Sequence, residues 1–372
     1  MTTELPLPAL TTASGPPAEE FDVALLDLDG VVYLGREPVP GAAAALAAAR
    51  ERGMRIAFVT NNASRTPDEV VTLLDEVGVK AEPAEVVTSA QAAARVLAER
   101  LPAGARVLVI GSAALRAEVV ARGLVPVSEA EDDPQAVVCG FSPELGWRHL
   151  VEATVAVRRG AYWLATNLDI TLPSPRGPVP GNGSLVGAVA AALGRRPDVA
   201  GKPDPALHRE SVDRTGARRP IAVGDVLGTD IEGANRVGCA SLLVLSGVTV
   251  PADVLIAAPK HRPTFIAADV GGLLNAQAAV DVTGSDYRCG RWRASWEGAG
   301  VTLRVGSGAP STDARPVSDP DRLDALRAAC VALWSATGIA SPTSVDELGE
   351  VLSAGGEEAA AVLRDWGVPA GA

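Results

Sequence analysis

The chain has 372 residues and a formal net charge of −12. This length predicts two or three compact units, and the negative charge argues against nucleic acid or an acidic membrane surface as the main partner. The four cysteines are far apart and form no Cys-x-x-Cys pair, which indicates reduced packing residues in a cytoplasmic protein rather than a disulfide scaffold or a zinc site. We expect no membrane span, because no segment is long and apolar enough.

The first 20 residues are rich in Pro, Ala and Thr and have neither a basic start nor an apolar stretch. We therefore expect residues 1–20 to be a disordered tail and not a signal peptide.

From Phe21 onward, short apolar runs alternate with helical stretches, which is typical of a doubly wound α/β sheet. The predicted order is a strand to Asp27, a helix over 41–52, a strand over 55–60 and a helix after Pro67. Apolar runs at 106–110, 136–139 and 162–165 indicate a second α/β region, and the first alternation resumes after Pro205. The expected fold is a Rossmann-like parallel core (21–84 and 197–276), an inserted α/β cap (85–196) and a small α+β C-terminal module (281–368).

The C-terminal module is predicted from a change in pattern beyond about residue 278. Residues 287–305 alternate like a hairpin, and helical stretches follow at 319–337 and 344–366. A glycine-rich segment at 304–308 is more typical of a turn than of an acyl-cofactor phosphate loop. Four of the six tryptophans lie in this module, and we interpret them as core residues rather than as a ligand-stacking surface; they are Trp292, Trp296, Trp334 and Trp366.

The first chemical motif is Asp27-Leu-Asp29-Gly30 at the end of an apolar run. Both carboxylates are expected at the carboxyl end of a parallel strand, where open α/β sheets bind ligands. Because the same string occurs in calcium loops and ordinary turns, these residues alone do not decide the chemistry.

Three later segments strengthen this signal, since each also falls at a strand end or helix start. Thr60, Asn61 and Asn62 offer groups that bind phosphate oxygens, although such residues also cap helices and turns. Lys202 can neutralise a phosphoryl group, although a lone lysine is usually a surface residue. Asp225 and Asp230 suit a hard cation with oxygen ligands, although both could cap a helix.

With these motifs together, the chain resembles the haloacid dehalogenase superfamily of phosphatases. It is similar to the nitrophenylphosphatase and pyridoxal-phosphatase-like branch, which carries a large α/β cap, and the resemblance covers about residues 21–274. The C-terminal module is similar to that of actinobacterial glycerol 3-phosphate phosphatases. The strings that carry the resemblance are Thr-Asn-Asn-Ala-Ser-Arg at 60–65, Ala-Thr-Asn-Leu-Asp at 165–169, Pro-Gly-Asn-Gly-Ser at 180–184 and Gly-Lys-Pro at 201–203.

The resemblance implies a Mg²⁺-dependent phosphatase that works through an aspartyl-phosphate. Asp27 would be the nucleophile, and Asp29 the general acid and then the base. Mg²⁺ would be held by the Asp27 carboxylate, the Asp29 backbone carbonyl and Asp225. The phosphoryl oxygens would be bound by Thr60, Asn61, Asn62 and Lys202, with Asp230 orienting Lys202 or a metal-bound water. Val226 and Leu168 depart from the family pattern at positions without a catalytic group.

The expected partner is a small phosphorylated metabolite, and the chain is compatible with a homo-oligomer. The cap is expected to close over the active site and select the leaving group, through a specificity loop with Asn167, Asp169 and Arg176 or, alternatively, a rigid turn. Glycerol 3-phosphate is the leading substrate, with phosphoglycolate and pyridoxal 5′-phosphate as alternatives. Asp29 and Asp225 argue against a dehalogenase, and a non-catalytic metabolite sensor would have to keep every catalytic group unused.

Overall fold

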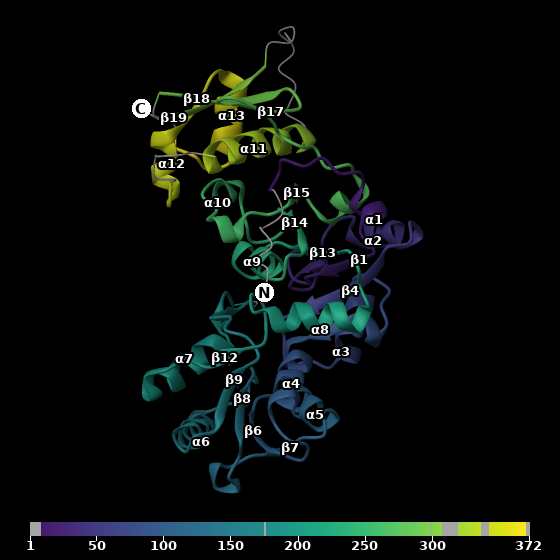
Figure 1. Ribbon diagram of the computed structural model, residues 1–372, viewed down its shortest axis with the longest axis vertical. Coiled ribbons are helices and arrows are strands. Elements are labelled where there is room, and N and C mark those ends of the chain that lie inside the picture. Colours follow the sequence, from purple (N-terminus) through teal and green to yellow (C-terminus); the bar gives the residue numbers. More distant parts are fainter. Residues whose placement is uncertain (1–8, 175, 299, 307–318, 336–341, 370–372) are drawn as a thin grey trace.

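The computed structural model describes residues 9–369 except 175, 299, 307–318 and 336–341. Three units follow one another along the long axis of the molecule, with the C-terminal unit at one end, the core unit in the middle and the cap at the other end (Figure 1). The cap is inserted between two parts of the core unit, so chain segments far apart in sequence meet in the core sheet.

The core sheet has six parallel strands in the order β15-β14-β13-β1-β4-β5. Alternate residues of its central strands enter different hydrophobic clusters: Leu26 and Phe58 point into one, Leu25 and Val59 into the other. Burial on both faces explains why the strands are continuous apolar runs. The strands are β1 (Val23–Leu26), β4 (Arg55–Thr60), β5 (Val86–Thr88), β13 (Pro220–Gly224), β14 (Ala240–Val244) and β15 (Phe265–Ala267).

Helices cover both faces of this sheet, as the α/β alternation predicted. A short hairpin of β2 (Tyr33–Leu34) and β3 (Glu37–Pro38) follows β1. The helices of the core unit are α1 (Pro17–Glu20), α2 (Ala42–Glu51), α3 (Pro67–Glu76), α4 (Ser89–Arg100), α8 (Pro205–Thr215), α9 (Glu232–Arg236) and α10 (Pro251–Leu255).

The cap contains its own five-stranded parallel sheet, ordered β12-β9-β8-β6-β7. A small hairpin of β10 (Thr171–Leu172) and β11 (Val179–Pro180) follows β9. The cap strands are β6 (Arg106–Ile110), β7 (Val125–Val127), β8 (Ala136–Cys139), β9 (Tyr162–Ala165) and β12 (Asp198–Val199), and its helices are α5 (Ala113–Ala121), α6 (Trp147–Arg158) and α7 (Asn182–Leu193).

Two short strands, and the helix α4 that follows the first of them, lie on the other side of the predicted unit boundaries. β5 pairs with β4 and extends the core sheet past residue 84, and β12 pairs with β9 and extends the cap sheet past residue 196. Both strands have only two or three residues, which is too short for a periodic pattern to assign them to a sheet.

The prediction of a disordered tail is wrong for residues 9–20, and residues 1–8 lie outside the described part. Leu10 is 1% exposed; its amide donates to Thr264 O at 3.2 Å and its carbonyl accepts from Val280 N at 2.9 Å. Ser14 pairs with Gln277. These contacts with residues 264–280 order the segment. Because the partners are far away in the sequence, no local sequence pattern could predict them.

The C-terminal unit is a five-stranded sheet, ordered β16-β17-β18-β19-β20, packed against α11. The second predicted helical stretch is interrupted, because β20 pairs in parallel with β19 between two helices. The first ends at Trp334, and residues 336–337 lie outside the described part. Bounds are β16 (Asp281–Thr283), β17 (Asp286–Cys289), β18 (Trp292–Glu297), β19 (Gly300–Val305), α11 (Asp319–Trp334), α12 (Val345–Val351), β20 (Leu352–Ala354) and α13 (Glu357–Asp365).

The tryptophans of this unit are core residues, as predicted. Trp292 and Trp366 are buried, Trp296 and Trp334 are partly buried, and all four join one hydrophobic cluster. Of the glycine-rich segment, residues 304 and 305 belong to β19, Gly306 N donates to Arg291 O at 2.7 Å, and residues 307–308 lie outside the described part.

The cysteines are packing residues, as predicted: Cys139, Cys239, Cys289 and Cys330 are all buried and free. Among the residues that the structure describes, no helix is long and apolar enough to span a membrane.

Candidate active site

Three adjacent strands of the core sheet end at the candidate site. β1 lies between β13 and β4, and Asp27 follows β1, Thr60 ends β4 and Asp225 follows β13. The loop before α8 brings Lys202 to the same place. Parallel strands present their carboxyl ends at one edge, so Asp27 and Asp225, which are 198 positions apart in sequence, become neighbours.

An acidic cluster forms the centre of the site. Carboxylate oxygens of Asp27, Asp225 and Asp230 lie within 4.8 Å of one another. Lys202 Nζ donates to Asp27 Oδ1 and lies 2.7 Å from Asp230 Oδ1, and it also donates to Val59 O at 3.2 Å. One ammonium therefore faces three carboxylates.

This charge imbalance is reflected in the pKa values of the cluster. Burial raises the pKa of Asp27 to about 7; Asp230 and Asp225 add to this effect, and Lys202 opposes it. Burial likewise raises the pKa of Asp225 to about 6, again with a contribution from Asp230. Burial lowers the pKa of Lys202, but the charges of Asp230 and Asp27 outweigh it and leave that pKa above its ordinary value. The site as built favours an additional positive charge.

The residues fit a divalent cation. Asp225 Oδ2 accepts a hydrogen bond from Val248 N at 2.7 Å, whereas the buried Asp225 Oδ1 has no hydrogen-bond partner among the described residues. A buried carboxylate oxygen without a partner is costly unless a ligand satisfies it. Asp230 is already bonded to Lys202 and, through Oδ2, to Val226 N at 3.1 Å. Asp27 and Asp225 are therefore the carboxylates best placed to hold Mg²⁺, whose preferred ligands are oxygens.

Asp29 lies at the edge of the site. Its side chain is exposed, and Oδ1 accepts from Gly35 N at 3.3 Å in the β2–β3 hairpin. Its carboxylate is not part of the acidic cluster of the described residues. This position suits a group that exchanges protons with a substrate and with water, rather than a carboxylate ligand of the metal.

Gly30 allows the chain to pass close to the acidic cluster. Its φ of 82° lies in the left-handed region, and an added Cβ would lie 2.8 Å from Asp225 Oδ1 and closer still to Oδ2. Glycine is required here for both the backbone angle and the space. Ser246 Oγ fixes this turn by donating to Gly30 O at 2.7 Å.

The three residues after β4 have different surroundings. Thr60 is buried, and its hydroxyl accepts from Asn62 N at 3.1 Å. Asn61 connects two loops: its Oδ1 accepts from Lys202 N at 2.8 Å and its Nδ2 donates to Lys202 O at 3.1 Å. Asn62 Oδ1 instead accepts from Ser64 N at 2.8 Å and so forms a local turn. The alternative predicted for these residues, a structural role in a turn, therefore applies to the side-chain carbonyl of Asn62.

The predicted specificity loop separates into two parts. Asn167 is buried and donates to Asn61 O at 2.7 Å, and Asp169 Oδ1 accepts from Asn61 Nδ2 at 3.3 Å. These two residues hold this cap loop against residues 60–62, which we call the catalytic loop. Arg176 is exposed, and its backbone amide donates to the nearby Ser174 Oγ at 3.2 Å. Among the described residues, no contact brings Arg176 to the site.

Several residues that position the site were not singled out from the sequence. Ser89 Oγ donates to Asn61 O, and Asn182 Nδ2 holds Asn167 O at 2.7 Å. Gly247 packs directly against the Asp225 carboxylate. Asn182 carried a signal, since it lies in the family-like string at 180–184, but serine and glycine in loops are too common to be distinctive.

Comparison with known proteins agrees with this geometry. Residues 24–125 match the haloacid dehalogenase-like hydrolase family and residues 199–273 match the HAD-hydrolase-like family. The chain is 44% identical over 349 residues to D-glycerol 3-phosphate phosphatase of Mycobacterium tuberculosis, which covers 94% of this chain and 95% of that protein.

Two solved structures extend the comparison. The crystal structure of a glycerol phosphate phosphatase from M. tuberculosis in complex with magnesium superposes with a TM-score of 0.82 at 42% identity, covering 96% of this chain and 100% of that one. A 4-nitrophenylphosphatase from Thermotoga maritima gives a TM-score of 0.64 at 33% identity and covers 69% of this chain and 98% of that one. As the motifs at Asp27, Thr60, Lys202 and Asp225 predicted, the chain belongs to the haloacid dehalogenase superfamily of hydrolases.

Proposed function

We propose that the chain is a Mg²⁺-dependent phosphatase that hydrolyses glycerol 3-phosphate. The observation that carries this proposal is the meeting of Asp27, Asp225 and Lys202 at the carboxyl ends of adjacent strands, with Asp225 Oδ1 left without a partner among the described residues. The similarity to D-glycerol 3-phosphate phosphatase over 94% of the chain supports the choice of substrate.

Asp27 is the nucleophile in this mechanism. A carboxylate oxygen attacks phosphorus in line with the leaving group, the bond to the leaving oxygen breaks, and Asp29 donates a proton to that oxygen. Asp29, now ionised, takes a proton from water, which attacks the aspartyl-phosphate. The bond between phosphorus and Asp27 breaks, inorganic phosphate is released, and the Asp27 carboxylate and the protonated Asp29 are restored.

The surrounding residues hold the phosphoryl group. The ammonium of Lys202 stabilises charge on the phosphoryl oxygens, while Asp230, at 2.7 Å, fixes the direction of that ammonium. Thr60 and Asn61 lie beside it at the end of β4. Asn62 uses its Oδ1 in a local turn, and its Nδ2 has no hydrogen bond to another of the described residues. Mg²⁺ held by the carboxylates of Asp27 and Asp225 and by the Asp29 carbonyl would supply the charge that lets a phosphate dianion approach three carboxylates.

The cap supports a small leaving group. The loop with Asn167 and Asp169 lies directly on Asn61, so the cap brings polar side chains to this part of the site. Phosphoglycolate and pyridoxal 5′-phosphate are the alternative substrates, and a sensor without turnover is the alternative function. A reducing, cytoplasmic location is part of the proposal, because four free buried thiols are typical of it.

The test is phosphate release from a panel of small phosphomonoesters, with Mg²⁺ and with chelator, for the wild type, Asp27→Asn and the control Asp75→Asn. Asp75 is an exposed carboxylate paired with Lys80. We expect Mg²⁺-dependent turnover, highest for glycerol 3-phosphate, in the wild type and the control and its loss in Asp27→Asn. Binding of the panel compounds without turnover would refute the phosphatase and favour the sensor.

A further inference from the structure

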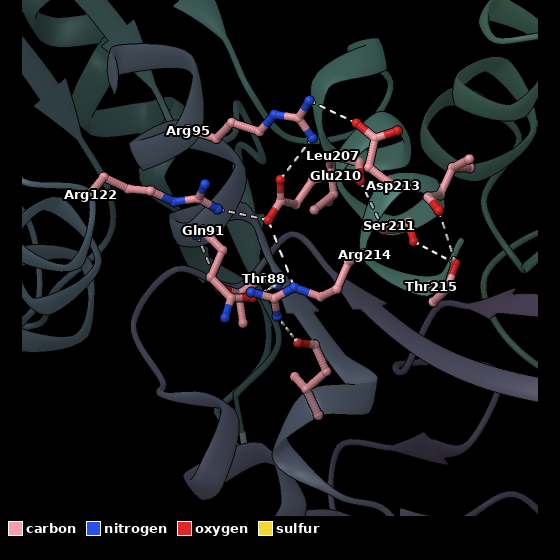
Figure 2. A network of polar contacts seen from close by, with 12 residues as sticks. Thr88, Gln91, Arg95, Arg122, Leu207, Glu210, Ser211, Asp213, Arg214 and Thr215 are labelled. Atoms are coloured by element: carbon pink, nitrogen blue, oxygen red, sulfur yellow. Dashed lines mark hydrogen bonds and ion pairs between the residues drawn. The ribbon is translucent and has the colours of Figure 1, made fainter. Parts of the chain in front are cut away.

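A buried carboxylate joins the cap to the core unit away from the catalytic residues. Glu210 of α8 is 4% exposed. Its Oε2 accepts from Arg95 Nη1 of α4 at 3.0 Å, and its Oε1 accepts from Arg122 Nη2 at 2.9 Å. Arg122 is the residue that ends the cap helix α5. Figure 2 shows the two arginines reaching Glu210 from different elements. We call Arg95, Arg122 and Glu210 the cap joint.

The other end of α5 is also attached to the core unit. Ser112 caps the N-terminus of α5, and its hydroxyl donates to Ala63 O at 2.9 Å. Ala63 immediately follows the loop that contains Thr60, Asn61 and Asn62. Since α5 has nine residues and is about 14 Å long, one rigid element is fixed at two separated points, and two points resist rotation better than one.

Both attachment points belong to segments that carry phosphate-binding groups. The helix that holds Glu210 is capped by Asp204, two residues after Lys202. The loop that accepts the Ser112 hydroxyl begins at Thr60. A displacement of α5 would therefore act on both segments that carry phosphate-binding groups.

Apolar packing supports the same arrangement. Leu115 and Val119 of α5 lie in one hydrophobic cluster with Leu207 of α8 and Val59 of β4. A lid that opens in each turnover would have to expose this continuous cluster and separate Arg122 from a buried carboxylate, which is costly. In this structure these contacts hold α5 of the cap against the core unit.

We propose that Glu210 and Arg122 are positioning residues that set the distance between the cap and the catalytic loop, and so the space for the leaving group. This inference rests on the proposed phosphatase function. We expect a small polar leaving group to depend on that distance, because hydrogen bonds to the cap loop would form only over short distances. An aryl leaving group departs as a weakly basic anion, so the rate of hydrolysis of an aryl phosphate should depend mainly on the core unit.

The experiment compares Glu210→Gln and Arg122→Gln with the control Glu99→Gln. Glu99 also bonds Arg95, at 2.7 Å, but its side chain is 63% exposed and, among the described residues, makes no hydrogen bond or ion pair to α8 or α5. For each variant we would measure kcat and KM for glycerol 3-phosphate and for 4-nitrophenyl phosphate, and inhibition by inorganic phosphate. Arg122→Lys tests rescue, since it keeps the charge.

We expect kcat/KM for glycerol 3-phosphate to fall about tenfold, mainly through KM, as misplacement of a positioning element predicts. The value for 4-nitrophenyl phosphate should change less than about twofold, inhibition by phosphate should be unchanged, and Arg122→Lys should recover part of the loss. A variant that merely folds poorly would lower kcat for both substrates equally and would leave their ratio intact.

The proposal is overturned if Arg122→Gln folds and the ratio of the two kcat/KM values equals that of the wild type. Should Glu210→Gln not fold, Arg122→Gln still decides, because the Arg122 side chain is 33% exposed. If the wild type does not hydrolyse glycerol 3-phosphate, the proposed substrate is wrong, and the same ratio is measured with the best substrate of the panel. That ratio then tests the positioning role of Glu210 and Arg122.

Discussion

The substitution Gly247→Ala tests the structural basis of the proposed metal site without removing a carboxylate. An added Cβ at Gly247 would lie 2.8 Å from Asp225 Cβ and closer to its carboxyl oxygen Oδ2. Carbon atoms in contact prefer about 3.5–4.0 Å, so the Asp225 side chain must move by about 1 Å. Mg²⁺ demands nearly ideal octahedral geometry, and a misplacement of about 1 Å can reduce a rate about 100-fold.

The assay is a Mg²⁺ titration of phosphatase activity, together with calorimetric measurement of Mg²⁺ binding. We expect Gly247→Ala to bind Mg²⁺ at least about tenfold more weakly and to lose about 100-fold in activity at limiting Mg²⁺. Gly228→Ala is the matched control, because Gly228 lies in the helical turn Leu227–Ile231, between Asp225 and Asp230 in the sequence, and an added Cβ there meets nothing within 4 Å. Wild-type Mg²⁺ affinity in Gly247→Ala would refute the assignment of Asp225 to the metal.

Three further predictions concern charge, protonation and packing. Lys202→Met should reduce kcat, measured at saturating Mg²⁺, about 100- to 1000-fold, because it removes the ammonium that lowers the pKa of Asp27 and faces the phosphoryl group. A loss of kcat under tenfold would contradict this role of Lys202. Burial, with a contribution from Lys202 and opposed by Asp230, lowers the pKa of His208 from the ordinary 6.5 to about 4. As the pH falls from about 6.5 to 4, the unfolded state therefore takes up a proton before the folded state does, and the free energy of unfolding decreases. Measured by denaturant unfolding, His208→Gln should lack about 3 kcal/mol of this decrease, and a pH profile equal to that of the wild type would argue against a buried neutral His208. Trp292→Ala should cost about 3–5 kcal/mol and, because its cluster includes residues of the core unit, should lower a single calorimetric transition rather than one of two.

The fold was predictable where apolar runs were long enough to show their period. The strands at Arg55–Thr60 and Arg106–Ile110 have the expected bounds, because each is a run that is buried after its first residue and that ends in a loop before the next helix. Site residues were predictable for a related reason. Parallel strands bring their ends together, so carboxylates placed directly after two such strands, as Asp27 and Asp225 are, must become neighbours.

What the sequence could not reveal depends on long-range geometry. Arg122 and Glu210 are 88 positions apart, and each alone looks like a solvated charge on a helix. Asn62 has the same residue type as Asn61, yet one carboxamide oxygen accepts from Lys202 N and the other closes a local turn. Side-chain chemistry permits both uses, and the choice is made by the loop that approaches from residue 201, where an added Cβ would lie 2.6 Å from Asn61 Oδ1.

The C-terminal unit shows how a change in sequence pattern differs from a physical boundary. The pattern changes near residue 278, but the hydrophobic cluster of this unit includes Leu243 and Ile266 of the core sheet. The buried Arg327 of α11 donates to the backbone carbonyl of Ile266 at 2.6 Å, which belongs to the edge strand β15. An edge strand with exposed backbone groups is prone to pairing with other chains. By covering β15 and sharing its apolar contacts, α11 acts as part of the structure that supports the catalytic sheet.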